Sequence, residues 1–481
     1  MDKNPRVLHI SAECYPAAKA GGLADVVGAL PKYLNQQNFP SQVIIPKYSV
    51  PWIKKQSWKK IASDQVPIGY YNQPYRIERL TSEDLGFEFF VIDLPWKFDR
   101  PGIYSDPDGR FYGDDAERFI CFQRCVLHWV SKIAAKPDII HCHDYHTGLI
   151  PFFIKYCSDF KALRNIPSIF TIHNGRYHGT FGWNQKYLLP YFDQYLGGLI
   201  EWSGAINPLA AGIKNAHRVT TVSRAYLEEL KEDSHGLEWL LHEESSKSIG
   251  ILNGIDTDVW DPKTDRALAF TLKKSVPFYK RKNKTPLIGT FGLDKKFPLV
   301  AFIGRFAREK GADILPDLVY RVLSFGLEIN ILILGSGDQI VQNSLNDMRA
   351  MFKGRFNTYI GYNEDLAHQI YAGSDFLLMP SRVEPCGLNQ MYAMRYGTIP
   401  IVRRTGGLND SVVDIGDPSG NGIMFNYVSI DDIWHALYRA EQLFHQKQDF
   451  ERIISKNMQL DYSWTKSAKG YISEYEKALG R

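Results

Sequence analysis

Short apolar runs recur along the chain, each followed by a polar turn and a stretch with helical spacing. The runs of the first half are Arg6–Ser11, Ser41–Pro46, Phe87–Asp93, Asp138–His143, Ser168–His173 and Arg218–Ser223. Those of the second half are Leu299–Arg305, Glu328–Gly335, Asn357–Gly361, Asp375–Pro380 and Ile399–Arg403. Nearly continuous apolar strands that alternate with helices are typical of parallel sheets covered on both faces. The pattern therefore predicts an α/β fold with two doubly wound parallel sheets, which bind ligands at the carboxyl ends of their strands.

A polar segment, 253–284, separates the two series of runs. It opens with the turn signal N-G-I-D-T-D-V-W-D-P and ends in F-Y-K-R-K-N-K, where we interpret the basic cluster Lys280–Lys284 as a solvated connector. The boundaries that follow are 1–251 for a first Rossmann-like domain and 252–460 for a second. The last segment, 461–481, repeats apolar and aromatic residues at helical spacing and predicts a packed C-terminal helix.

Composition narrows the class of protein. A chain of 481 residues exceeds what one hydrophobic core usually serves, and 44% hydrophobic with 23% charged residues is ordinary for globular proteins. A net charge of +4 is too small to indicate binding to nucleic acid. No apolar run reaches the roughly 18 residues of a membrane helix, and the N-terminal residues lack a signal-peptide pattern. With 6 cysteines and no disulfide framework, we expect a cytoplasmic protein that does not associate with a membrane.

The stretch K-A-G-G-L, which starts at Lys19, lies between a predicted strand and a predicted helix. Gly21 and Gly22 at a helix start place free backbone N–H groups at the positive end of the helix dipole, which favours an anion. Lys19 adds a cation. A glycine pair at a helix start is also a common cap, so this stretch alone leaves both interpretations open.

A second basic stretch, F-I-G-R-F-A-R-E-K-G, follows the first strand of the second domain and contains Arg305 and Lys310. Two exposed charges near a helix start would explain it equally well in isolation. Basic strand–loop–helix sites in both domains instead favour one ligand gripped by both, and a diphosphate is the expected ligand.

The stretch P-S-R-V-E-P-C-G-L places Glu384 between a strand end and a helix that would begin at Gly387–Leu388. Backbone N–H groups at that helix start can hold a phosphate, while Glu384 can accept hydrogen bonds from hydroxyl groups. A nucleotide sugar carries hydroxyls next to a diphosphate and suits this arrangement. A local capping role of Glu384 remains the alternative, and a glycine pair, Gly406–Gly407, follows the next strand.

The run I-I-H-C-H-D-Y-H contains His141, His143, Asp144 and His146, residue types that bind metals. Adjacent side chains of a strand point to opposite faces, and no H-E-x-x-H pattern or CxxC pair supports a metal site. We therefore expect no metal and place Asp144 against substrate hydroxyls. His173, in T-I-H-N, ends another strand at the same edge, where a purely structural role is the alternative.

Together these stretches resemble bacterial glycogen and starch synthases (glycosyltransferase family 5) over essentially the whole chain. The matching blocks are K-A-G-G-L-A-D-V-V-G-A-L-P, H-C-H-D-Y-H-T-G-L, T-I-H-N, L-N-G-I-D-T-D-V-W-D-P, the Arg305-x4-Lys310 pair, P-S-R-V-E-P-C-G-L and R-R-T-G-G-L. The resemblance implies the GT-B fold, in which two Rossmann-like domains face a deep cleft and a C-terminal helix crosses back to the first domain. It also implies retaining transfer of glucose from ADP-glucose to the 4-hydroxyl at the non-reducing end of an α-1,4-glucan such as glycogen, without a cofactor or metal.

The resemblance further implies roles for individual residues at the donor's phosphates. Lys19 and the backbone of Gly22 would approach the phosphates from the first domain. Arg305 and Lys310 would neutralise the diphosphate from the second domain and stabilise the charge that grows on the leaving group.

Other roles implied by the resemblance concern the sugar. Glu384 would hold glucose hydroxyls and the distal phosphate together with the backbone of Cys386, Gly387 and Leu388. The glucose pocket would be lined by Asp144, His173 and Asn253, and the backbone carbonyl of His173 would face the developing anomeric cation. Tyr104, in R-P-G-I-Y-S-D, matches a loop tyrosine near the glucan and the donor.

Three places depart from the family pattern: Ala20, where many relatives have Thr or Val, Asn389 and the Gly175–Gly179 loop. Asn389 replaces a frequent threonine after C-G-L, and the loop Gly175–Gly179 differs from that of many relatives, so their contacts are not assigned. Tyr392 stands where related glycosyltransferase families carry a second glutamate, as expected for the synthase branch. Without a pair of carboxylates for the acid and nucleophile roles of retaining hydrolases, we expect a front-face mechanism.

The sequence leaves other functions open. The same fold could serve a retaining glucosyltransferase that uses UDP-glucose or a different acceptor. A non-catalytic glucan-binding protein is a second alternative, and a metal hydrolase built on the histidine cluster is a third. No sequence pattern identifies the base of the nucleotide, the length of the glucan or the oligomeric state.

Overall fold

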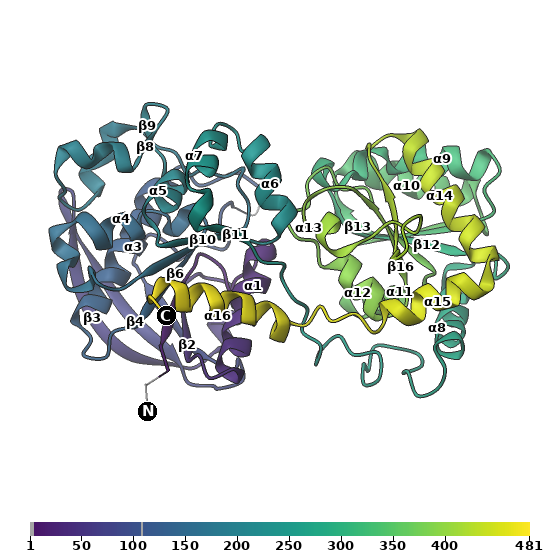
Figure 1. Ribbon diagram of the computed structural model, residues 1–481, viewed down its shortest axis with the longest axis horizontal. Coiled ribbons are helices and arrows are strands. Elements are labelled where there is room, and N and C mark those ends of the chain that lie inside the picture. The colour runs from purple at the N-terminus through teal and green to yellow at the C-terminus, as the bar shows by residue number, and fades with distance from the viewer. Residues whose placement is uncertain (1–3, 107–108) are drawn as a thin grey trace. The chain divides into compact units, whose positions relative to one another are not determined.

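The computed structural model describes residues 4–106 and 109–481, which form two compact units (Figure 1). Unit 1 comprises the described part of Met1–Val222, Leu227–Ile251 and the C-terminal segment Trp464–Arg481. Unit 2 comprises Leu252–Ser463 and the short stretch Ser223–Tyr226. Each unit contains an α/β sheet of its own, and every apolar run predicted as a strand is a strand.

The described residues of unit 1 form a nine-stranded sheet in the order β11-β10-β7-β6-β1-β2-β5-β4-β3. The strands are β1 (Val7–Ile10), β2 (Ser41–Pro46), β3 (Trp58–Ile68), β4 (Tyr71–Leu80), β5 (Glu88–Asp93), β6 (Ile139–His143), β7 (Ser168–Ile172), β10 (Arg218–Thr221) and β11 (Ser248–Gly250). The pairs from β11 to β5 are parallel. Since β1 lies between β6 and β2, the direction of winding changes at β1, where a doubly wound sheet binds its ligands.

The hairpin of β3 and β4 is antiparallel, as is the pair of β4 and β5. The prediction of a wholly parallel sheet is therefore wrong at this edge. Most side chains of β3 are exposed, so the strand lacks the continuous apolar run that marked the other strands. Its turn passes through Gly69, whose φ of 56° favours glycine.

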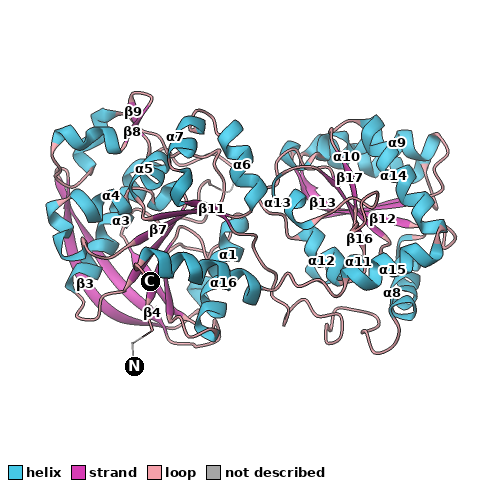
Figure 2. Ribbon diagram, in the orientation of Figure 1, coloured by secondary structure: helices cyan, strands magenta, loops and turns pink. Residues whose placement is uncertain are grey.

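Helices flank both faces of this sheet (Figure 2). The α-helices are α1 (Gly22–Gln36), α2 (Pro51–Lys55), α3 (Asp115–Lys132), α4 (Ile150–Tyr156), α5 (Pro208–Asn215), α6 (Arg224–Glu232), α7 (Glu238–Glu243) and α16 (Trp464–Ala478). The shorter elements are the 3-10 helices η1 (Tyr145–Thr147), η2 (Ser158–Leu163), η3 (Trp183–Leu188), η4 (Gln194–Leu199) and η5 (Ser245–Lys247), and the strand pair β8 (Glu201–Trp202) and β9 (Ala205–Ile206). Within the described residues, no helix is long and apolar enough to cross a membrane.

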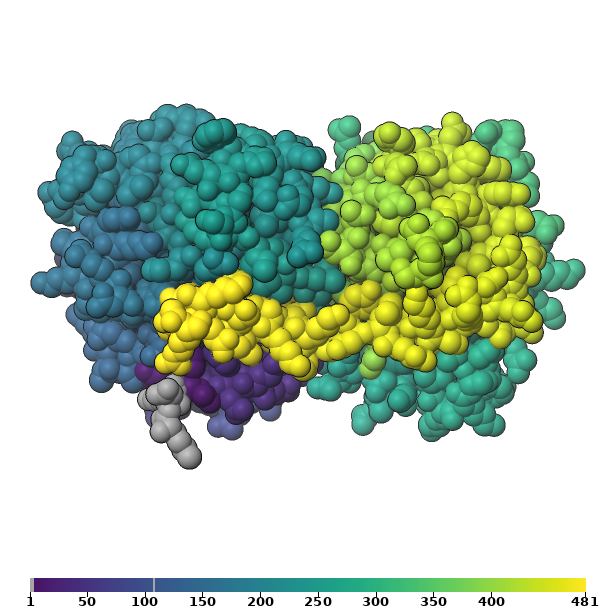
Figure 3. Space-filling model, viewed as in Figure 1, coloured from purple at the N-terminus to yellow at the C-terminus, as the bar shows by residue number. Residues whose placement is uncertain are grey.

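The C-terminal helix α16 packs beside α1 on the sheet of unit 1. Trp464, Ala468, Tyr471 and Tyr475 recur at helical spacing and are buried in one core cluster with residues of α1, β1, β6 and β7. Figure 3 shows α16 in yellow at the surface of unit 1, next to the purple N-terminal elements. The predicted packed C-terminal helix is therefore present.

The described residues of unit 2 form a six-stranded parallel sheet in the order β14-β13-β12-β15-β16-β17. The strands are β12 (Leu299–Phe306), β13 (Asn330–Gly337), β14 (Phe356–Ile360), β15 (Phe376–Met379), β16 (Ile399–Arg403) and β17 (Ile423–Phe425). The direction of winding changes between β12 and β15. The carboxyl ends of these two strands are therefore the expected ligand site of unit 2.

Helices also cover both faces of the second sheet, with one apolar core cluster on each side (Figure 2). They are α8 (Val276–Phe291), α9 (Leu315–Ser324), α10 (Gln339–Met351), α11 (Glu364–Gly373), α12 (Asn389–Arg395), α13 (Gly406–Ser411), α14 (Ile430–His445) and α15 (Lys447–Asn457), with the 3-10 helices η6 (Arg308–Lys310) and η7 (Ala312–Ile314). The predicted α/β class with two doubly wound sheets is thus confirmed.

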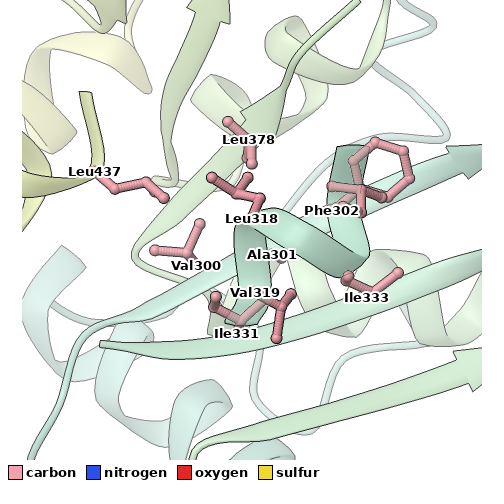
Figure 4. Close-up of a pocket in the computed structure, with 10 residues that line it drawn as sticks. Val300, Ala301, Phe302, Leu318, Val319, Ile331, Ile333, Leu378 and Leu437 are labelled. Atoms are coloured by element: carbon pink, nitrogen blue, oxygen red, sulfur yellow. The ribbon is translucent and has the colours of Figure 1, made fainter. Parts of the chain in front are cut away.

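A small internal cavity lies in one of these core clusters, between β12, β13 and α9 (Figure 4). Its volume is about 10 Å³, and its labelled side chains are all apolar. That volume is at the lower limit of about 10–15 Å³ that a water molecule needs, and an apolar lining offers a water no partner. The cavity is therefore a packing gap and not a ligand site.

The interpretation of Lys280–Lys284 as a solvated connector is wrong. The cluster lies inside helix α8, and Lys280 is 8% exposed. Its Nζ donates to the carbonyl of Ser374 (2.6 Å) and to Oγ1 of Thr398 (2.8 Å), and burial lowers the pKa of Lys280 to about 7. The basic cluster therefore includes a structural amine that joins α8 to the end of α11 and the start of β16.

Replacing Lys280 by alanine should lower the free energy of unfolding by about 3 kcal/mol, because the buried carbonyl of Ser374 and Oγ1 of Thr398 each lose a hydrogen bond from Nζ. Lys282 lies in the same helix and is exposed, so Lys282→Ala should change the free energy by less than about 0.5 kcal/mol. Denaturant unfolding of both variants measures the difference. Equal effects of the two substitutions would contradict the buried role of Lys280.

Candidate functional site

The loop after β1 holds the first group of expected site residues in unit 1. Helix α1 begins at Gly22 with Gly21 as its N-cap, so the predicted helix start is confirmed. A Cβ built on either glycine would meet no atom within 4 Å, so the space beside these two residues is open. Lys19 is exposed beside this opening and forms an ion pair with Asp25 (Nζ to Oδ1, 2.6 Å). The loop therefore offers an accessible cation next to a helix N-terminus.

A hollow of about 580 Å³ lies on unit 1 beside Lys19. Its lining comes from three segments: Pro16–Ala20, Val50–Trp52 and Pro101–Asp106. The volume falls within the roughly 300–1,000 Å³ of small-molecule sites. Tyr104, the tyrosine expected near the glucan, therefore lines the same hollow as Lys19.

Glu13, which is not among the predicted site residues, joins Tyr104 to the backbone that follows Lys19. Its Oε2 accepts from the backbone N–H groups of Ala20 (2.5 Å) and Gly21 (2.9 Å), and its Oε1 accepts from the hydroxyl of Tyr104 (2.7 Å). Burial raises the pKa of Glu13 even though these hydrogen bonds lower it. A carboxylate just after the strand where the winding changes was the available signal for this residue.

Asp144 follows β6 in a strained conformation, with φ at 56° and ψ at 179°. Such a backbone is rare for a residue other than glycine and is found at functional sites. Its Oδ1 accepts from the backbone N–H groups of His173 (2.7 Å) and Asn174 (3.3 Å). Burial raises the pKa of Asp144 to about 7. Asp144 and His173, both expected to line the glucose pocket, are therefore in direct contact, and the carboxylate fixes the backbone of His173.

The four residues considered as a metal cluster do not converge on one point. Asp144 holds backbone N–H groups, and the ring of His146 stacks on Tyr104 with centroids 4.9 Å apart. His141 and His143 instead lie beside His9, and one ring nitrogen of each falls within 4.8 Å of the others. These nitrogens take part in hydrogen bonds with neighbouring side chains.

In unit 2, Glu384 and Lys310 form an ion pair at the carboxyl ends of β12 and β15. Nζ of Lys310 lies 2.9 Å from Oε1 and 2.7 Å from Oε2 of Glu384, and the hydroxyl of Ser381 donates to Oε2 (3.0 Å). Arg305 lies within β12 and not after it, is strongly exposed, and pairs with Glu309. Lys310 ends the short helix η6, whereas α9 begins only at Leu315. A carboxylate and two cations are therefore grouped at the expected ligand edge of this sheet.

The loop that follows Glu384 forms the other part of this edge. The backbone N–H of Asn253 donates to Sγ of Cys386, and burial raises the pKa of that thiol. Gly387 has φ at 71°, and Leu388 is the N-cap of α12. A Cβ on Gly407 would lie 2.1 Å from the carbonyl oxygen of Cys386, so the second glycine pair allows close packing against this loop.

Asn389, Tyr392 and the Gly175–Gly179 loop have structural partners. Nδ2 of Asn389 donates to the carbonyl of Ile303 in β12 (2.9 Å). The ring of Tyr392 stacks on Trp260 with centroids 3.9 Å apart. In the Gly175–Gly179 loop, Nε2 of His178 contacts the carbonyl of Gly175 (3.2 Å). These contacts hold the strand edge and the loop in place.

Known proteins share both the sequence and the fold. Residues 6–243 match the family model of the starch synthase catalytic domain, and residues 297–440 match the model of group 1 glycosyl transferases. The chain is 47% identical over 471 residues to the glycogen synthase of Flavobacterium johnsoniae, covering 98% of each chain. It is 37% identical over 488 residues to the glycogen synthase of Anoxybacillus flavithermus, again covering 98% of each.

One solved structure is similar over nearly the whole chain. The catalytic domain of starch synthase IV from Arabidopsis thaliana, bound to ADP and acarbose, superposes with a TM-score of 0.87 at 33% identity, covering 99% of this chain and 100% of that one. The GT-B fold implied by the sequence is thereby confirmed. On these matches, the chain belongs to the glycogen and starch synthase family of glycosyltransferases, enzymes that elongate a glucan by glucosyl transfer.

Proposed function

We propose that this enzyme transfers glucose from ADP-glucose, with retention, to the 4-hydroxyl at the non-reducing end of an α-1,4-glucan. The grouping of Lys310, Arg305 and Glu384 at one sheet edge carries the proposal, because a nucleotide sugar needs cations for its diphosphate and an acceptor for its hydroxyls. The similar Arabidopsis domain is bound to ADP, which supports an adenine nucleotide as the leaving group.

In unit 2, Arg305 and Lys310 neutralise the diphosphate as the leaving group gains charge. Glu384 accepts from glucose hydroxyls, while the backbone of Cys386, Gly387 and Leu388 contacts the distal phosphate. Both oxygens of Glu384 contact Lys310, so the ion pair holds this carboxylate in place as an acceptor of hydrogen bonds. Asn253 contributes to the same edge through its hydrogen bond to Cys386.

In unit 1, Lys19 and the backbone N–H of Gly22 contact donor phosphates from the open helix start. Asp144 and His173 contact the glucose, and the carboxylate of Asp144, which accepts from the backbone N–H of His173, orients the carbonyl of His173 toward the anomeric carbon. Tyr104 contacts the glucan from the hollow that it lines. The departing phosphate assists deprotonation of the acceptor hydroxyl on the same face, which retains the anomeric configuration.

Incubation with glycogen and either ADP-glucose or UDP-glucose tests the proposal. We expect release of ADP together with chain extension, faster than release of UDP, and activity that survives a chelator. The added glucose should be removable by a hydrolase specific for α-1,4 linkages.

Each alternative function has a distinct outcome in this assay. Faster transfer from UDP-glucose would reverse the donor assignment. Binding of glycogen without release of either nucleotide would indicate a non-catalytic glucan-binding protein, and loss of activity with chelator would indicate a metal enzyme.

A further inference from the structure

A chain of three imidazole rings runs through the core of unit 1 and ends at the proposed glucose contact. Nε2 of His173 lies 3.0 Å from Nδ1 of His143, and Nε2 of His143 lies 3.1 Å from Nδ1 of His9. The rings come from β1, β6 and the end of β7, which are neighbours in the sheet. The proposed mechanism uses only the last of the three rings.

The three rings are deeply buried. His9 and His143 have no exposed surface, and His173 retains 7%. Burial lowers the pKa of all three imidazoles, to about 3 for His9 and His173. Each ring is therefore neutral near pH 7 and carries one N–H, on either Nδ1 or Nε2.

The geometry of the links couples the three tautomers. Each link joins Nε2 of one ring to Nδ1 of the next and needs one donor and one acceptor. If His143 carries its proton on Nδ1, it donates to Nε2 of His173 and must accept from Nδ1–H of His9. The three rings therefore carry their protons either all on Nδ1 or all on Nε2.

The ring at the buried end of the imidazole chain, His9, decides which of the two tautomeric states forms. Nε2 of His9 is buried and has no hydrogen-bonding partner among the described residues. A buried N–H without an acceptor is rarer in proteins than an acceptor without a donor, because the lost hydration of the N–H is costly. The proton of His9 therefore belongs on Nδ1, and the same follows for the other two rings.

We propose that His9 and His143 are positioning residues that hold His173 in the Nδ1–H tautomer. His173 then presents an N–H, and not a lone pair, at Nδ1, the nitrogen of its ring that does not face His143. The role of this N–H rests on the proposed function, since its expected acceptor is a hydroxyl oxygen of the substrate. Asp144 fixes the backbone of His173, and the imidazole chain fixes the proton on its ring.

Neutron diffraction from crystals of the perdeuterated, unmodified protein near pH 7 tests the assignment directly. We expect deuterium on Nδ1 of His9, His143 and His173 and none on their Nε2 atoms. Deuterium on Nε2 of any of the three would overturn the proposal. This result is independent of activity, so a failure of the proposed donor or acceptor leaves the tautomer test intact.

Kinetics provide the second test. In His143→Asn, an amide remains near the position of Nδ1 and can donate or accept, so His173 keeps a partner but is uncoupled from His9. We expect kcat/KM for the donor to fall about tenfold, with the KM for glycogen unchanged. In that background, His9→Asn should cause no further loss, because the chain is already broken.

Tyr475→Phe is the matched control. The hydroxyl of Tyr475 contacts Nδ1 of His141 (2.8 Å), a ring that stacks on His143 but is outside the chain. This variant should lose a buried hydrogen bond and some thermal stability while keeping kcat/KM. Additive losses in the double variant of His9 and His143, or an equal loss of kcat/KM in Tyr475→Phe, would overturn the positioning role.

Discussion

Replacing Lys310 by alanine should lower kcat for glucosyl transfer by a factor of about 10² to 10³, the usual effect of removing one group that stabilises transition-state charge. Lys310 contacts both oxygens of Glu384 in the free protein, so the substitution also leaves a mostly buried carboxylate without its cation. The measurement is steady-state transfer to glycogen at saturating donor. A near-normal kcat would refute the role of Lys310 at the diphosphate.

A second ion pair in unit 2 provides a control that distinguishes a loss of catalysis from a loss of stability. Lys284 pairs with Asp375 at 2.5 Å, and both side chains are at least as buried as those of Lys310 and Glu384. Lys284→Ala should therefore destabilise the protein at least as much as Lys310→Ala while leaving kcat unchanged. If both variants lose kcat in proportion to their loss of stability, the effect at Lys310 is structural.

Asp144→Asn should remove most of the activity and yet stabilise the folded protein at alkaline pH. The pKa of Asp144 is raised from 3.8 to about 7, so the unfolded chain loses this proton near pH 4 and the folded chain near pH 7. Its contribution to stability is thus fully present below about pH 4 and is lost as the pH rises through 7. Asparagine has no such proton, and its Oδ1 can still accept from the N–H of His173.

Denaturant unfolding of both proteins at pH 5 and pH 8 measures this effect. Relative to the unmodified protein, Asp144→Asn should gain roughly 2–3 kcal/mol of unfolding free energy between the two pH values. A difference that does not depend on pH would contradict the raised pKa. A variant that is more stable but has lost glucosyl transfer is expected where an active site holds a strained, buried charge, because such a charge serves activity at a cost in stability.

The fold could be predicted wherever a strand is buried on both faces. Each run from Arg6–Ser11 to Ile399–Arg403 became a strand, because a doubly covered parallel strand must be apolar throughout. The hairpin of β3 and β4 escaped prediction since β3 is largely exposed and only half of the residues of β4 are buried. Lys280 was misassigned for a related reason: sequence shows a charge but not the carbonyl groups that surround it.

The candidate site could be predicted in its charged and glycine-rich parts but not in its buried supports. Lys19, Lys310 and Glu384 lie in short stretches with a recognisable strand–loop–helix order. Glu13 and His9 contact side chains far along the chain, Tyr104 and His143. No local pattern encodes such contacts, because the pairing of strands creates them.

The packing of α16 on unit 1 sets an order of assembly during synthesis. Glu474 pairs with Arg218, and Tyr475 contacts His141. Unit 1, most of which is synthesised first, therefore obtains part of its core from α16, which is synthesised last. Ribosomes add about 5–20 residues per second, and all of Leu252–Ser463 must be made in between. For those tens of seconds the face of the sheet that α16 covers stays open in the nascent chain, where a chaperone or a second chain can reach it.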